Sequence, residues 1–229
     1  MFNKTKQICK ENNIKPVRSR GQNFLINEDV YDFIVNAAEI KKDDIILEVG
    51  PGLGFLTEKL ARKVKRVIAV ELDDKLANLL KVNLKEKKID NVEVVNGNIL
   101  DFRIKNRIKN QESRIKDNNQ NYDRSSLDSL FFILNSKYKI VANLPYNITS
   151  VFLRKFLSCE NKPKSMVLML QKEVADRIVA GPGKMSLLAV SVQFYAKAEI
   201  IKYVPKIDFW PVPKVDSAVI QLRIKNEEL

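Results

Sequence analysis

The segment IILEVGPGLG, residues 45–54, decides the fold class of this chain. Its first half, Ile45 to Val49, is a largely apolar run that predicts a buried strand, because strands covered on both faces of a sheet are apolar throughout. The glycines that follow permit a tight turn whose backbone a ligand can approach closely. Ligand sites at the carboxyl ends of strands are typical of open α/β sheets.

Strand-like and helical segments alternate on both sides of this turn. We expect helices at 29–40, 56–63, 75–85, 151–157, 173–179 and 187–194, and further strands at 67–70, 92–95, 138–142, 166–170, 200–204 and 218–224. Such alternation predicts a parallel sheet with helices on both faces. Residues 101–136 interrupt the pattern and are rich in Asn, Lys and Arg. We expect a polar, partly disordered surface insertion there, which is either a solvated loop or an RNA-contacting arm.

Charge and composition narrow the classes of function. Lys and Arg total 40 against 28 Asp and Glu, a net charge of +12, which favours a nucleic acid partner over a merely Lys-rich surface. The chain has no His, and its two Cys lack metal or redox spacing, so His-dependent triads are excluded and no metal site is expected. Without a membrane-length apolar stretch or a signal peptide, we expect a cytoplasmic protein with no membrane partner. No self-association motif is evident, so we expect a monomer.

Two kinds of cofactor compete for the glycine turn. A dinucleotide fingerprint needs G-x-G-x-x-G, but here the third glycine, Gly54, comes one residue early and Phe55 takes its place. The form G-x-G-x-G after an acid suits a cofactor with a charged amino-acid end and no phosphate, such as S-adenosylmethionine; a purely structural turn is the alternative. Glu71, about twenty residues on, can accept hydrogen bonds from ribose hydroxyls in either cofactor. Asp73 and Asp74 are competing acids.

The tetrapeptide Asn143-Leu144-Pro145-Tyr146 follows the expected strand at 138–142. An adenine amine is a poor nucleophile because its lone pair is delocalised into the ring. The Asn143 side chain and the Leu144 backbone carbonyl can accept its two hydrogens and localise that lone pair. Pro145 stiffens the turn, and Tyr146 can stack on the base. The alternative is a strand-to-helix turn in which Asn143 caps the start of the following helix and Pro145 marks the turn.

Two other positions are candidates for contacts with bases. Asn98 follows the expected strand at 92–95, where an amide can accept from an amine and donate to a ring nitrogen of adenine. The loop FWPVP, residues 209–213, is rigid and can supply a second stacking face for a target base. The alternative for this loop is core packing, which is the commoner place for Phe and Trp.

Together these motifs resemble the ribosomal RNA small-subunit adenine-N6 dimethyltransferase family, the KsgA/Dim1 group. The resemblance is carried by GQNFL at 21–25, EVGPGLGFLT at 48–57, VELD at 70–73, NLPYNITS at 143–150, LQKEVADRIVA at 170–180 and FWPVPKVDSAV at 209–219. It implies a Rossmann-like class I methyltransferase with a mostly parallel seven-stranded sheet, and S-adenosylmethionine as cofactor. The implied substrate is two adjacent adenines in a hairpin loop near the 3′ end of small-subunit rRNA. Each adenine would receive two methyl groups during maturation of the small ribosomal subunit.

The resemblance also implies roles for individual residues. The implied cofactor-binding residues are Gln22, Asn23, Leu25, Gly50, Gly52, Glu71, Leu72, Asn98, Ile99 and Asn143. Among them, Gly50 would hold the methionine end, Glu71 the ribose and Asn98 the adenine. The implied catalytic residues are Asn143, Leu144, Pro145, Tyr146 and Phe209. Residues 1–25 would form a basic segment that closes over the cofactor, and residues 26–229 the methyltransferase domain.

Three departures from the family pattern leave other functions open. Position 98 is usually Asp, the insertion at 101–136 is long, and the chain stops at Leu229, where the family continues into a small helical domain that we expect to be missing. A large-subunit rRNA adenine-N6 methyltransferase of the antibiotic-resistance type is one alternative. A non-catalytic RNA-binding assembly or transcription factor on the same scaffold is another, and DNA adenine methylation is a third.

Overall fold

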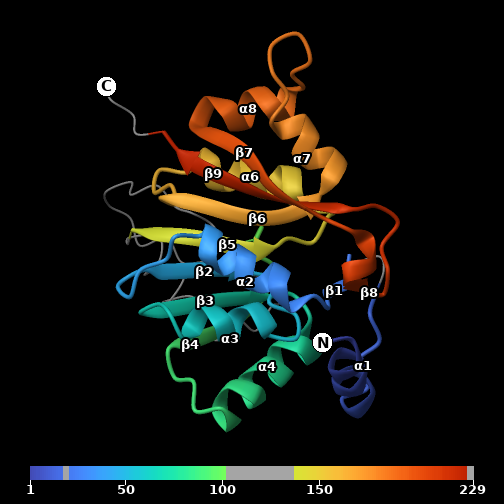
Figure 1. The fold of residues 1–229 in the computed structure, drawn as a ribbon. Coiled ribbons are helices and arrows are strands. Elements are labelled where there is room, and N and C mark those ends of the chain that lie inside the picture. The colour runs from blue at the N-terminus through green and yellow to red at the C-terminus, as the bar shows by residue number, and fades with distance from the viewer. Residues whose placement is uncertain (18–20, 102–136, 226–229) are drawn as a thin grey trace.

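A seven-stranded sheet forms the centre of the protein. The computed structural model describes residues 1–17, 21–101 and 137–225. The strand order is β4-β3-β2-β5-β6-β9-β7 (Figure 1). The strands are β2 (Ile45–Val49), β3 (Arg66–Glu71), β4 (Val92–Asn96), β5 (Tyr138–Asn143), β6 (Ser165–Gln171), β7 (Ala196–Val204) and β9 (Ser217–Ile224). Only β9 pairs antiparallel with its neighbours, so the prediction of a mostly parallel seven-stranded sheet is confirmed.

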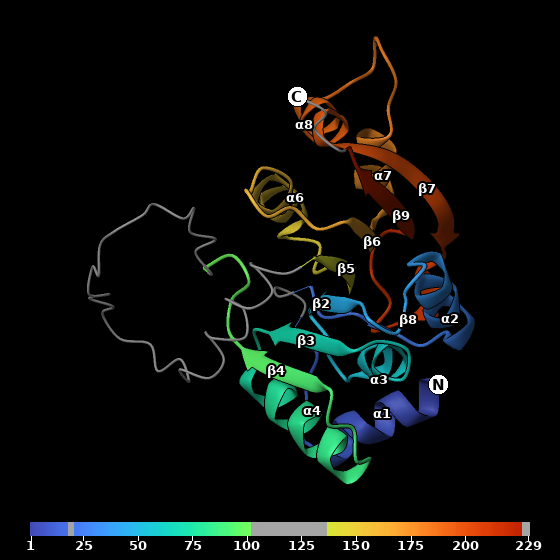
Figure 2. The same ribbon diagram turned by 90° about the vertical axis from the view of Figure 1, so that its left-hand side faces the viewer.

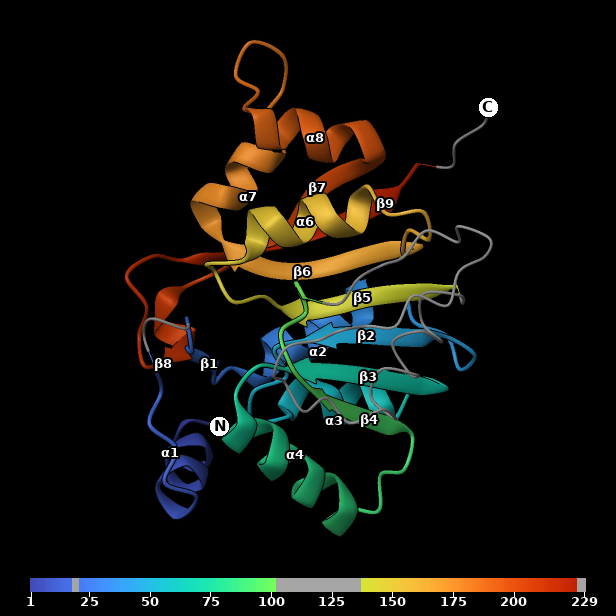
Figure 3. The same ribbon diagram turned by 180° about the vertical axis from the view of Figure 1, so that it is seen from behind.

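Helices cover both faces of the sheet (Figure 2). On one face lie α2 (Glu28–Ala37), α3 (Phe55–Ala61) and α4 (Asp74–Glu86), with α1 (Phe2–Glu11) beside them. On the other lie α6 (Thr149–Leu157), α7 (Lys172–Ile178) and α8 (Leu187–Tyr195), which lie in front of the sheet in Figure 3. Successive side chains of a strand point to opposite faces. Ile46 of β2 accordingly packs against α2 and α3, whereas Leu47 and Val49 pack on the α6 side.

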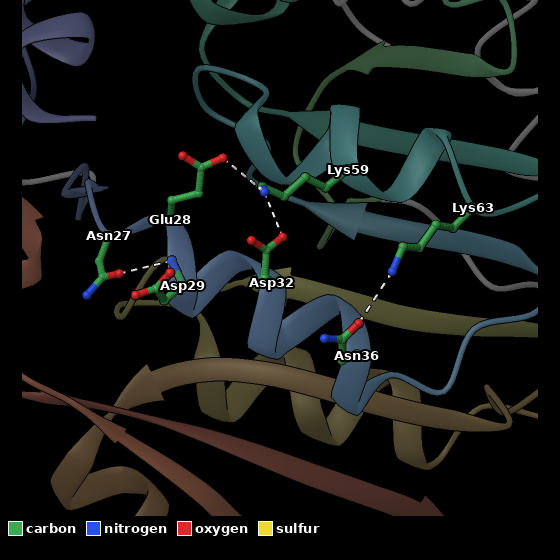
Figure 4. A network of polar contacts seen from close by, with 7 residues as sticks. All are labelled: Asn27, Glu28, Asp29, Asp32, Asn36, Lys59 and Lys63. Carbon is green, nitrogen blue, oxygen red and sulfur yellow. Dashed lines mark hydrogen bonds and ion pairs between the residues drawn. The ribbon is translucent and has the colours of Figure 1, made fainter.

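Polar contacts fasten α3, the helix that begins in the glycine turn, to α2 (Figure 4). The Lys59 ammonium lies 3.2 Å from the Glu28 carboxylate and 2.6 Å from that of Asp32. One turn further on, Lys63 donates to the side-chain oxygen of Asn36 at 3.3 Å. Exposed ion pairs each contribute little, about 0.2–1 kcal/mol. They add to the packing of the buried Leu56 and Leu60, which holds α3 in the core cluster that it shares with α2.

Several features differ from the sequence predictions. Helix α1 was not predicted, although Thr5 and Cys9 on one side of it are buried. The two-residue strands β1 (Phe24–Leu25) and β8 (Phe209–Trp210) pair with each other and were also not predicted. The predicted insertion at 101–136 lies outside the described residues apart from its first position. None of the described helices is long and apolar enough to cross a membrane.

Candidate active site

A cleft lies at the carboxyl ends of β2, β3, β4 and β5. It leaves about 1140 Å³ free of atoms, its open mouth included. Every residue predicted to bind the cofactor lines it: Gln22, Asn23, Leu25, Gly50, Gly52, Glu71, Leu72, Asn98, Ile99 and Asn143. Leu144, Pro145 and Tyr146 line it as well. The fold therefore gathers the glycine turn, the acid after β3 and the tetrapeptide after β5 around one space.

The glycine turn depends on backbone angles that other residues rarely adopt. Gly50, Gly52 and Gly54 have φ values of 68°, 56° and 83°. A Cβ on Gly50 would lie 3.3 Å from Cδ of Pro145, and one on Gly52 would lie 3.4 Å from the ring of Phe24. Glycine thus lets the tetrapeptide and the N-terminal segment approach the turn closely. At Gly50 and Gly52 the turn lines the cleft with backbone atoms, because glycine has no side chain.

Glu71 binds the turn to the end of β3. Its carboxylate accepts from the backbone N–H of Gly52 at 3.0 Å and from that of Asp73 at 2.9 Å. The side chain is 6% exposed. Burial raises its pKa, and the N–H donors of Asp73 and Gly52 oppose that rise. Of the competing acids, Asp73 also lines the cleft, but its carboxylate caps α4 through the N–H groups of Lys75 and Leu76. Asp74 is the first residue of that helix.

Glu48 is a buried acid among the residues that line the cleft, and it is not one of the site residues predicted from the sequence. It is 1% exposed, and its Oε2 has no hydrogen-bond partner among the described residues. Burial raises the pKa of Glu48 to about 8; the Thr57 hydroxyl opposes this rise, and the negative charge of Glu71 adds to it. The sequence signal for Glu48 is an acid two residues before Gly50, the first glycine of the turn. A buried acceptor that has no partner and belongs to a residue lining a cleft is a candidate ligand group.

The tetrapeptide after β5 is held by contacts to three parts of the fold. The backbone N–H of Leu144 donates to the carbonyl of Met169 in β6 at 3.0 Å. The Tyr146 hydroxyl lies 2.7 Å from the Ser217 hydroxyl at the start of β9. A Cβ on Gly21 would lie 3.4 Å from the Tyr146 nitrogen, so the N-terminal segment passes directly over the turn.

Asn143 does not serve as a helix cap. Helix α6 begins only at Thr149, and its N-cap residue is Ile148. The capping alternative for this side chain is therefore wrong. Asn143 lies at the end of β5, among the residues that line the cleft.

Hydrogen bonds of Gln22 hold the N-terminal segment at the edge of the cleft. The Gln22 amide donates to Asp73 at 3.3 Å, and its oxygen accepts from the backbone N–H of Val17 at 2.8 Å. Asn98 also makes a local contact, in which its side-chain oxygen accepts from the N–H of Leu100 at 3.0 Å. That bond shapes the turn after β4 and leaves the donor side of the amide as the part suited to a ligand.

Phe209 does not line the cleft. It is 1% exposed and pairs with Leu25 in the β1·β8 ribbon, where the N–H of Ile26 also donates to the carbonyl of Asp208 at 2.7 Å. Its ring belongs to the core cluster on the α2 side of the sheet. The structure therefore supports the packing alternative for Phe209 and corrects its prediction as an open stacking face. Packed there, it supports the ribbon that carries Leu25 into the cleft.

Comparison with known proteins identifies the family. Residues 13–229 match the family model described as "Ribosomal RNA adenine dimethylase". The chain belongs to this family. Among curated relatives, "Ribosomal RNA small subunit methyltransferase A" of Dehalococcoides mccartyi is 40% identical over 96% of this chain and 66% of the relative. The Clostridioides difficile protein of the same name is 37% identical over 98% of this chain and 71% of the relative. The chain thus spans about two thirds of the length of these relatives.

Solved structures share the fold of this chain. A dimethyladenosine transferase from Plasmodium falciparum superposes with a TM-score of 0.68 and 31% identity, over 88% of this chain and 63% of that one. The 23S rRNA methyltransferase ErmE gives a TM-score of 0.69 and 29% identity, over 90% of this chain and 71% of that one. The predicted class I methyltransferase fold is confirmed.

Proposed function

We propose that this protein transfers methyl groups from S-adenosylmethionine to the N6 amines of two adjacent adenines near the 3′ end of small-subunit rRNA, in the immature small ribosomal subunit. One observation carries the proposal. The tetrapeptide Asn143–Tyr146 opens into the same cleft as the glycine turn and Glu71, in a chain that is 40% identical to a relative named as a small-subunit rRNA methyltransferase.

The cleft has groups that match each part of the cofactor. The close backbone at Gly50 and Gly52 leaves room for the methionine end, and the unpartnered Oε2 of Glu48 is an acceptor for its ammonium group. Glu71 would accept from the ribose hydroxyls, and Asn98 and Ile99 would border the adenine. Gln22, Asn23 and Leu25 would cover the ligand, so residues 1–25 act as the closing segment. When bound, the cofactor supplies an electrophilic methyl group on a positively charged sulfur.

The tetrapeptide would prepare the target amine. The side-chain oxygen of Asn143 and the carbonyl of Leu144 accept its two hydrogens, which localises the nitrogen lone pair and aims it into the cleft. Pro145 fixes the turn, and the ring of Tyr146 stacks on the base, which must leave its own stack to enter. Most of the rate enhancement then comes from positioning and from fixed dipoles, and no strong base is needed.

A specific similarity supports one alternative substrate. ErmE, named as a 23S rRNA methyltransferase, superposes as well as the dimethyladenosine transferase does, with TM-scores of 0.69 and 0.68. Large-subunit rRNA is therefore the second candidate. The curated relatives at 37–40% identity favour the small subunit.

The test compares methyl transfer from labelled S-adenosylmethionine to unmethylated small subunits and to large subunits. The wild-type protein should label the small subunit, and Asn143→Ala should lower turnover at least about 100-fold, the loss expected when a transition-state contact is removed. Asn78→Ala, at an exposed position of α4, is the matched control and should retain full activity. Near-normal turnover by Asn143→Ala with a folded protein would refute the amine-orienting role.

A further inference from the structure

The Tyr146 hydroxyl is anchored at a point far along the chain. It lies 2.7 Å from the hydroxyl of Ser217, and 71 residues separate the two. Ser217 is fully buried and is the first residue of β9. It pairs there with Gln171, the last residue of β6, and with Val204, the last residue of β7. Three strands thus fix the position of the Ser217 oxygen.

The residue before Ser217 is fixed as well. The backbone carbonyl of Asp216 accepts from the N–H of Lys172, which starts α7, at 3.0 Å. The Asp216 carboxylate accepts from the N–H of Lys206, which starts the short helix η2 (Lys206–Asp208), at 2.9 Å. The start of β9 is therefore attached to two neighbouring elements and cannot shift easily. An anchor of this rigidity is suited to holding a side chain in one orientation.

The hydrogen bond explains why a tyrosine is useful at position 146. A phenylalanine ring would stack on a base equally well, but its far end would have no attachment. The Tyr146 ring is fixed at both ends, by its backbone next to Pro145 and by its hydroxyl on Ser217. Burial raises the pKa of Tyr146; the Ser217 contact opposes this rise, and the Glu173 carboxylate adds to it. The hydroxyl therefore stays protonated at neutral pH and remains able to donate.

We propose that Ser217 is a positioning residue for methyl transfer, which holds the Tyr146 ring in the orientation that stacks on the target base. This inference rests on the proposed function, because it concerns the adenine side of the same cleft. Ser217 does not line the cleft itself, so it acts through Tyr146 and not on the cofactor. Removing the Ser217 hydroxyl should lower kcat/KM for the rRNA substrate and leave the affinity for S-adenosylmethionine unchanged.

The experiment is a double-mutant cycle with Ser217→Ala, Tyr146→Phe and the double variant. A neutral hydrogen bond is worth about 1 kcal/mol, so each single variant should lower kcat/KM for the small subunit about five-fold. The double variant should be no worse than Tyr146→Phe alone, because that change has already removed the attachment. Calorimetry should give the wild-type Kd for S-adenosylmethionine in all three variants.

A control separates positioning from a general loss of stability. The Ser186 hydroxyl caps α8 by accepting from the N–H of Ala189 at 3.2 Å, so Ser186→Ala removes a comparable hydrogen bond away from Tyr146. It should lower the Tm of the protein and leave kcat/KM within about two-fold of wild type.

Three outcomes would overturn the inference, and they distinguish it from the proposed function. An active wild type with a Ser217→Ala variant of equal kcat/KM, or single-variant losses that simply add in the double variant, would refute the role of Ser217 and leave the proposed function standing. A wild-type protein that binds S-adenosylmethionine but labels neither ribosomal subunit would refute the proposed function, and the inference with it.

Discussion

Replacing Glu48 by Gln should stabilise the ligand-free protein at neutral pH and change its stability much less at pH 5. Glu48 is 1% exposed, and one of its oxygens has no partner among the described residues. Burial, opposed by the Thr57 hydroxyl and reinforced by Glu71, raises its pKa from 4.5 to about 8. Gln has nearly the same shape and does not titrate, so the variant removes the ionisation and little else.

The sign of the effect follows from proton binding. The folded protein holds the Glu48 proton more tightly than the unfolded chain does, so stability is lost as the pH rises from 4.5 toward 8. Each pKa unit of difference corresponds to about 1.4 kcal/mol. The raised pKa of Glu48 then lowers the free energy of unfolding by about 1 kcal/mol at pH 5 and by about 3 kcal/mol at pH 7.

Urea denaturation, followed by the fluorescence of the single tryptophan, Trp210, measures this cost. The gap in unfolding free energy between Glu48→Gln and wild type should widen by about 2–3 kcal/mol from pH 5 to pH 7. Glu86→Gln, at an exposed position of α4, controls for the loss of a surface charge. A gap that stays constant across this range would refute the buried, proton-holding state of Glu48.

Three other predictions follow from the same structure. Gly54→Ala should cost about 2–4 kcal/mol of stability in urea unfolding, because φ is 83° and the new Cβ would overlap a methyl group of Leu80; Gly181→Ala, where a Cβ meets nothing, should cost far less. The buried thiols of Cys9 and Cys159, whose pKa values burial raises, should resist Ellman's reagent in the native protein and react in urea; fast native reaction would contradict their burial. Binding of S-adenosylmethionine at pH 7 should release a proton from Glu48, which calorimetry in buffers of different ionisation enthalpy detects; buffer-independent heats would argue against an ammonium contact there.

The sheet was largely predictable from sequence because its strands are buried on both faces. The segment at 45–49 is predicted with the bounds that β2 has, since a largely apolar run of this length ended by glycines is typical of a buried strand. The alternation of strands and helices then fixed the order of the remaining elements. The strand β7 begins at Ala196, earlier than the predicted residue 200, because its first half alternates between exposed and covered positions and lacks an apolar run.

The features that escaped prediction depend on contacts between distant residues. The β1·β8 ribbon has two residues a strand, too few for any periodicity, and its pairing of Leu25 with Phe209 is what buries that ring. The contact between Tyr146 and Ser217 likewise cannot be predicted from a local sequence pattern, because the two positions are 71 apart in the chain. Glu48 was passed over as a site residue because it lies within an apolar strand, and only the fold shows that its side chain reaches the cleft.

The most direct test of the proposed function is to map the methyl groups. Small subunits lacking the modification are incubated with the protein and labelled S-adenosylmethionine, and the rRNA is then digested and analysed by mass spectrometry. We expect N6,N6-dimethyladenine at two adjacent positions near the 3′ end of the small-subunit rRNA, and none after reaction with Asn143→Ala. Label confined to large-subunit rRNA, or no label from a protein that binds the cofactor, would contradict it.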